Sequence, residues 1–149
     1  MPSTSTPTAV MNAVKEQLGK LTNEQQPLLK TVRILNRPAQ PYDLFEQFPD
    51  LTGFPAAILV PQDIHQENSG LTRYLTLDLY LIRQEYLLPE IPRSQLKLLD
   101  EVLSVLLPDE QGRLPQFGGG HLEFQYSSPC LFGDEHPGWQ IRMEVHYVR

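Results

Sequence analysis

The chain has 149 residues, a length typical of one domain that can bury a core without disulfides. Its formal net charge of -6 argues against nucleic-acid binding as a main function, because neutralisation of phosphate charge supplies most of that affinity. Cys130 is the only cysteine, which excludes an internal disulfide and a thiolate metal cluster within one chain and indicates a reducing site of synthesis.

The N-terminal region is predicted to hold a flexible segment and one helix. Residues 1–8 are rich in proline, serine and threonine, so we expect them to be flexible, with a single domain over residues 9–149. MPSTSTPT lacks the features of a secretory leader, and no apolar run approaches the roughly 20 residues that cross a bilayer, so we expect no membrane contact. Thr8 is the predicted N-cap of a helix over Ala9–Leu21, whose apolar stripe comprises Val10, Val14, Leu18 and Leu21.

Two strands separated by a long connection are predicted next. Leu28–Leu35 is the first strand candidate. Residues 36–53 form a proline-containing connection with a short turn of helix, in which Phe45 and Phe48 should anchor the loop to the body. The run from Ala56 to Val60 is apolar throughout, which is typical of a central strand covered on both faces.

Residues 71–83, LTRYLTLDLYLIR, carry a leucine at every second position over the middle of the run. This alternation predicts a strand about twice as long as the usual 5–6 residues. We expect it to pair with the preceding strand as an antiparallel hairpin, across a polar loop of about ten residues. At about 3.3 Å per residue it would span about 40 Å, so one end is expected to extend past the body. The alternative is a coiled strand contained within the fold.

A second helix and two strands complete the prediction. The helix begins at Pro92 or after Ser94 and ends at Pro108, and its apolar stripe comprises Leu96, Leu99, Leu103 and Leu106. Residues 108–120 and 127–138 are predicted loops. Between them lies a strand over His121–Tyr126, with one side formed by Leu122, Phe124 and Tyr126. The last strand covers residues 139–148, with one face formed by Trp139, Ile141, Met143, Val145 and Tyr147.

This order of elements favours an α+β fold. We predict a two-layer sandwich, in which two helices pack on one face of a mainly antiparallel sheet that contains a long β-hairpin. The leucine face of residues 71–83 and the Trp139 face of the last strand would together form the floor of one core.

The polar residues give little sign of chemistry. None of the four histidines lies in a metal-binding motif: His65, His121, His136 and His146. Glu144 and His146 share one face of a strand and form a weak candidate ligand pair, but a solvated polar face is the favoured interpretation. FGGGH leads into a strand instead of a helix, which is typical of a turn or bulge and not of a phosphate-binding loop. We therefore predict no metal site, no cofactor and no enzyme activity.

Asp78 lies in the middle of the long strand, where a carboxylate can serve as a catalytic base. The alternation of the strand instead places Asp78 on the same face as Tyr74, Thr76 and Tyr80, opposite the leucines. We therefore predict an exposed or interface residue. Aromatic surface on such a strand usually marks contact with another chain. The residues predicted to form this subunit or partner interface are Arg73, Tyr74, Asp78, Tyr80 and Arg83.

The order of elements and the phrase FPAAILV at residues 54–60 resemble the tail terminator and tail-completion proteins of tailed bacteriophages. The resemblance covers most of the chain, although the long loop at residues 108–138 departs from the usual plan. It implies a virion protein, made in the host cytoplasm, that forms a ring, commonly a hexamer. Such a ring caps the tail tube protein and receives a head–tail connector or neck protein, while DNA passes through the lumen without specific binding. An acidic lumen would repel phosphates and so lower friction on the DNA.

Two other functions remain open at this point. One is a small-ligand or regulatory binding module that uses a pocket between the helices and the sheet. The other is an enzyme that uses His146 and Glu144, or a metal.

Overall fold

The computed structural model describes residues 7–23, 26–35, 37, 39–66, 72–82, 93–106, 116–117, 120–133 and 136–148. The helices in these ranges are α1 (Pro7–Gly19), the 3-10 turn η1 (Pro41–Asp43), α2 (Leu44–Gln47) and α3 (Arg93–Ser104). The strands are β1 (Thr22–Asn23), β2 (Gln26–Pro27), β3 (Thr31–Ile34), β4 (Ala56–Gln66), β5 (Thr72–Ile82), β6 (Gln116–Phe117), β7 (Gly120–Phe132) and β8 (His136–Val148).

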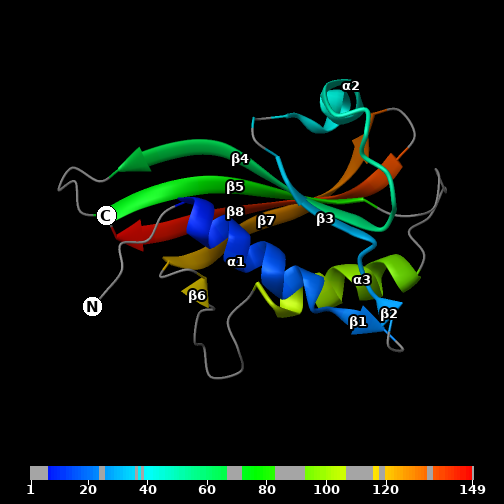
Figure 1. The fold of residues 1–149 in the computed structure, drawn as a ribbon, viewed down its shortest axis with the longest axis horizontal. Helices are drawn as coiled ribbons and strands as arrows, with labels where there is room; N and C mark the ends of the chain where they lie inside the picture. Colours follow the sequence, from blue (N-terminus) through cyan, green and yellow to red (C-terminus); the bar gives the residue numbers. More distant parts are fainter. Residues whose placement is uncertain are drawn as a thin grey trace.

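Strands β3 to β8 form one open, twisted sheet (Figure 1). Its order is β3-β4-β5-β8-β7-β6, so β3 and β6 lie at opposite edges among the described residues. Only β3 and β4 pair in parallel, and the other neighbours are antiparallel. The predicted α+β fold with a mainly antiparallel sheet is therefore confirmed.

Helices α1 and α3 both contribute to the core on one face of the sheet (Figure 1). Each presents an apolar stripe to it, because residues three and four apart share one side of a helix. The stripe of α1 consists of the fully buried Val10, Val14 and Leu18, and α3 with its last turn adds Leu98, Leu99, Val102 and Leu106. The floor comes from the leucines of β5 and the apolar face of β8, as predicted: Leu75, Leu77, Leu79, Leu81, Trp139, Ile141, Met143 and Val145.

A second core lies on the opposite face of the sheet, at one end only. There the connection between β3 and β4, which contains η1 and α2, folds back over the strands (Figure 1). Phe48 is buried and Phe45 half-buried in this connection, so both anchor it as predicted. The start of β4, Ala56–Val60, is consequently buried on both faces. The second core comprises Leu35, Ala39, Leu44, Phe48, Leu51, Ala56, Ile58, Val60, Tyr80, Ile82 and Phe132.

The long strand is contained within the sheet. Strand β5 pairs with β8 over Thr72–Ile82 and with β4 over Arg73–Ile82. Strand β4 continues to Gln66, beyond the predicted end at Val60, so it matches β5 in length. Over the described residues the strand therefore does not stand alone, because it is paired on both sides, which agrees with the alternative of a strand contained within the fold.

The C-terminal hairpin is longer than predicted. Residues 127–132 continue β7 and residues 136–138 begin β8, where a loop was expected. Pro129 and Pro137 lie within this predicted loop, yet both fit the ladder. Pro129 lies on β7, which has β8 on one side and pairs with the two-residue β6 only at its start, and Pro137 precedes the point where β8 begins to pair with β5.

Smaller differences concern the ends of elements. Helix α1 begins at Pro7, so Thr8 lies inside it and is not the cap. A shift of register between Phe124 and Tyr126 turns the Tyr126 side chain to the face opposite Phe124, against the predicted alternation. Residues 1–6, Arg83 and Pro92 lie outside the described residues.

Candidate functional site

The second face of the sheet has a polar part beyond the end that the β3–β4 connection covers. Cross-strand register places polar residues of β5 opposite polar residues of β8 on this face. The pairs are Asp78 with Arg142, Thr76 with Glu144, and Tyr74 with His146. Because β7 adds Glu123 opposite Glu144, polar groups from three neighbouring strands meet here.

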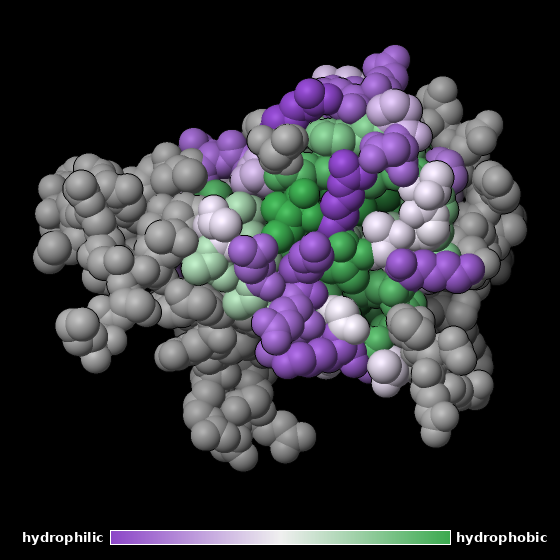
Figure 2. Space-filling model, viewed as in Figure 1, coloured by the Kyte–Doolittle hydropathy of each residue, from purple (hydrophilic) through white to green (hydrophobic). Residues whose placement is uncertain are grey.

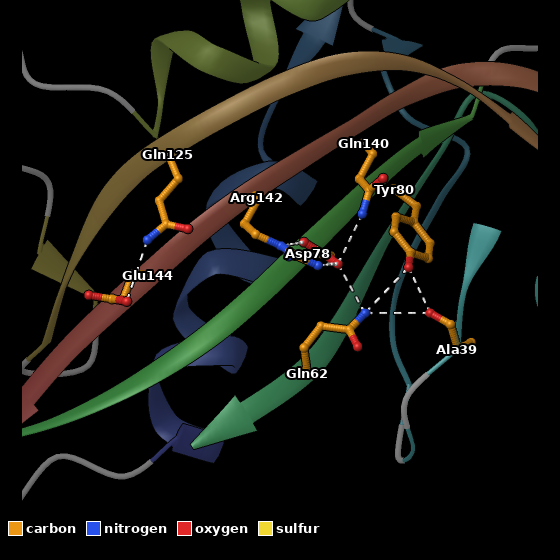
Figure 3. Close-up of polar contacts among 8 residues, drawn as sticks. All are labelled: Ala39, Gln62, Asp78, Tyr80, Gln125, Gln140, Arg142 and Glu144. Carbon is orange, nitrogen blue, oxygen red and sulfur yellow. Dashed lines mark hydrogen bonds and ion pairs between the residues drawn. The ribbon is translucent and has the colours of Figure 1, made fainter. Parts of the chain in front are cut away.

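Asp78 is at the centre of a hydrogen-bonded network (Figure 3). Its side chain is fully buried, and Arg142 binds it with Nε to Oδ1 and Nη2 to Oδ2, each at 2.8 Å. Gln62 and Gln140 also donate to Oδ2, at 3.0 and 3.2 Å. These bonds to Asp78 raise the pKa of Arg142 above its ordinary value, so the guanidinium remains charged. The carboxylate accepts four hydrogen bonds, which fits a structural role and leaves little capacity for proton transfer.

Tyr80 joins this network to the second core. Its hydroxyl donates to the carbonyl oxygen of Ala39 at 2.6 Å, and Gln62 Nε2 lies 3.4 Å from the same hydroxyl. The ring is fully buried and packs 5.1 Å from the ring of Phe132. Burial, with a smaller contribution from the charge of Asp78, raises the pKa of Tyr80 well above its ordinary value. The hydroxyl therefore fastens the β3–β4 connection to the sheet.

The interface predicted from the sequence is only partly compatible with this arrangement. Asp78 and Tyr80 do lie on the face opposite the leucines, as predicted. Both are fully buried within the chain, however, so the prediction that they meet a partner is wrong. Their face is covered at this end by the β3–β4 connection and by Phe132, which the alternation of β5 cannot reveal. Tyr74 is half-buried, and its ring meets the ring of His146 edge-on at 4.5 Å. The Arg73 side chain and the whole of Arg83 lie outside the described part of the chain.

A carboxylate–imidazole cluster lies further along the same face. His146 Nε2 is 2.9 Å from Glu144 Oε1 and 3.1 Å from Glu123 Oε2. One ligand atom from each of the three residues falls within 4.8 Å of the others, so the cluster has the dimensions of a metal site. The sequence indicated Glu144 and His146 but not Glu123, because Glu123 is on another strand and only the register brings it here.

Strand β7 carries exposed apolar side chains that the sequence did not identify as a contact surface. In the described ranges the outer edge of β7 is paired only where β6 meets its start, by Gln116 with His121 and Phe117 with Gly120. Three large apolar side chains of β7 are exposed: Phe124 at 39%, Tyr126 at 41% and Leu131 at 46%. Edge strands of this kind can pair with another chain.

The opposite edge of the sheet, at β3, also carries apolar surface. Partly buried apolar side chains of α1 and β3 pack on the first core there, namely Met11, Ala13, Val32 and Ile34. Figure 2 shows apolar surface between hydrophilic side chains in the middle of the view, where β3 crosses in Figure 1.

No family model matches the chain, and no curated protein is significantly similar to it. In the part of the chain that the structure describes, none of the helices combines the length and apolar character needed to cross a membrane.

Proposed function

We propose that this chain is a structural subunit of a bacteriophage tail, a terminator or completion protein that forms a ring at the head end of the tail tube. The order of helices and strands and the phrase FPAAILV support this proposal by their resemblance to that family. The observation that carries it is the exposed edge of β7, since a ring subunit needs surfaces that bind its neighbours.

The two edges of the sheet suit a head-to-tail contact. A ring requires two different, complementary surfaces on each subunit, because a contact between identical surfaces closes at a dimer. Strand β7 lies near one edge of the sheet and exposes Phe124 and Leu131, and Tyr126 on the face opposite Phe124, whereas β3 lies at the opposite edge beside apolar residues of α1. Binding of the β7 edge of one subunit to the β3 side of the next would bury both surfaces.

Features of the β7 edge also limit unwanted association. Pro129 removes one backbone donor, and the register shift after Phe124 bends the strand. Both devices hinder open-ended strand addition, so they favour a contact of defined geometry over aggregation. The net charge of -6 is compatible with a lumen through which DNA passes without binding.

The test is the oligomeric state of the full-length chain, measured by light scattering after gel filtration and by negative-stain microscopy. We expect a closed ring that also caps tail tubes polymerised from the tube protein of the same genome. Phe124→Lys combined with Leu131→Lys should dissociate the ring, because two charges would be buried in the contact. Tyr42→Lys is the matched control, since Tyr42 is 74% exposed on η1 and not on β7. A chain that stays monomeric at every concentration and leaves tube ends bare would overturn the proposal.

A further inference from the structure

Glu123 and Glu144 form a like-charged pair directly across two strands. Strands β7 and β8 place the two residues opposite each other in register, on the polar part of the second face. Like charges in this position are destabilising unless a cation lies between them. His146, two residues after Glu144 on the same face of β8, brings its Nε2 atom between the two carboxylates.

A protonated His146 could not fully hydrogen-bond or neutralise both carboxylates. Nε2 carries at most one hydrogen, whereas it lies 2.9 Å from Glu144 Oε1 and 3.1 Å from Glu123 Oε2. One hydrogen cannot point straight at both oxygens, and a singly charged imidazolium offsets only one of two carboxylates. A divalent cation would neutralise both carboxylates and would bind the Nε2 lone pair at the same time.

The donor set suits zinc. One imidazole nitrogen and two carboxylate oxygens are ligands that Zn²⁺ accepts, at about 2.0–2.2 Å from the metal. Tetrahedral geometry at those lengths separates ligand atoms by about 3.4 Å. The distances of 2.9 and 3.1 Å from Nε2 to the two oxygens are shorter than that value by about 0.5 and 0.3 Å. A fourth position would be left for water or for a group from a partner.

Neighbouring residues hold the ligands in place. Gln125 Nε2 lies 3.4 Å from Glu144 Oε2, the carboxylate oxygen that does not face His146 (Figure 3). The ring of Tyr74 packs edge-on against the His146 ring with centroids 4.5 Å apart, which restricts its rotation. The Glu123 side chain is about half exposed, so an ion can reach the cluster from solvent. A hydrogen bond to a ligating carboxylate, like that from Gln125, is typical of metal sites.

We propose that Glu123, Glu144 and His146 bind a divalent transition-metal ion, for which Zn²⁺ is the matching species. The site links β7 to β8 and does not depend on the proposed ring.

The experiment uses the full-length chain after treatment with a chelator, titrated calorimetrically with Zn²⁺ alone. Co²⁺ alone, followed by its absorption spectrum, reports the coordination geometry. We expect one ion per chain, a higher melting temperature with Zn²⁺, and affinity weakened by at least about tenfold in Glu144→Gln and in His146→Gln. Glu144→Gln should stay folded without metal, because it removes like-charge repulsion.

His136→Gln is the control, since His136 packs on Phe45 and Phe54 at the other end of β8. It should bind Zn²⁺ like the unaltered chain. Absence of stoichiometric uptake by the unaltered chain overturns the proposal, and so does uptake that is undiminished in His146→Gln. Circular dichroism of each variant without metal separates loss of binding from loss of fold.

Discussion

The buried Asp78–Arg142 pair allows a quantitative test of what stabilises the polar part of the sheet. Arg142→Leu removes two hydrogen bonds of 2.8 Å from a carboxylate whose side chain is fully buried. Hydrogen bonds to charged groups contribute about 1.5–3 kcal/mol each, which sets the loss at about 3–6 kcal/mol. A second estimate of the same loss comes from other buried ion pairs, in which removal of one partner lowers the free energy of unfolding by about 3–5 kcal/mol. Since Gln62 and Gln140 still donate to Oδ2, we expect about 3 kcal/mol.

A second variant separates the loss of the pair from the stranding of a charge. Asp78→Leu combined with Arg142→Leu removes both partners, and replacement of a buried pair by apolar side chains is often nearly neutral. The double variant should therefore be more stable than Arg142→Leu alone by at least about 1 kcal/mol. Arg33→Leu is the matched control, because its pair with Asp50 is much more exposed and should contribute less than about 1 kcal/mol.

The measurement is the free energy of unfolding in urea, followed by far-ultraviolet circular dichroism at one fixed protein concentration. Coincident transitions from tryptophan fluorescence would verify two-state behaviour. If Arg142→Leu lowers the free energy of unfolding no more than Arg33→Leu does, burial of the Asp78 carboxylate does not depend on Arg142 and the reasoning is refuted.

Three further predictions rest on single residues. Gly138→Ala should destabilise the chain by at least about 2 kcal/mol in urea unfolding, because a Cβ there would collide with the Leu81 carbonyl oxygen. Gly19→Ala, in open space at the end of α1, should be neutral or stabilising by up to about 1 kcal/mol, and equal losses would contradict this account. Because burial raises the pKa of Tyr80, the folded chain keeps this phenol protonated while the unfolded chain ionises it near pH 10. Stability should thus fall as pH rises above about 10, and less steeply in Tyr80→Phe; parallel pH profiles would refute the link. Burial also raises the pKa of the Cys130 thiol, so iodoacetamide should alkylate the folded chain several-fold more slowly than the urea-unfolded chain at about pH 8, and equal rates would contradict it.

Local pattern predicted much of the architecture. The period of two in β5 and β8 identified the residues that form the floor of the first core, and the stripe of α1 identified the side that packs on it. Both patterns reflect burial of one face of one element, which neighbouring residues along the chain are enough to express.

Features that depend on distant segments were not predictable in this way. Asp78 and Tyr80 are buried because the β3–β4 connection covers the second face, and nothing within β5 records that cover. Glu123 meets Glu144 only through the register of β7 on β8. Pro129 and Pro137 lie in strands where a loop was predicted, and they fit because the ladder does not require a backbone donor at an edge or at the start of a strand.

The two ends of the sheet face different evolutionary constraints. At the end where the helices pack on one face and the β3–β4 connection on the other, residues on both faces of β4 and β5 are buried, and few substitutions will fit. Toward the other end only the helical side carries a packed layer, so exposed positions on the opposite side, outside the polar clusters there, can vary without disturbing that layer. A lineage carrying this fold could therefore change what its surface recognises there, one substitution at a time, while the doubly enclosed end preserves the shape.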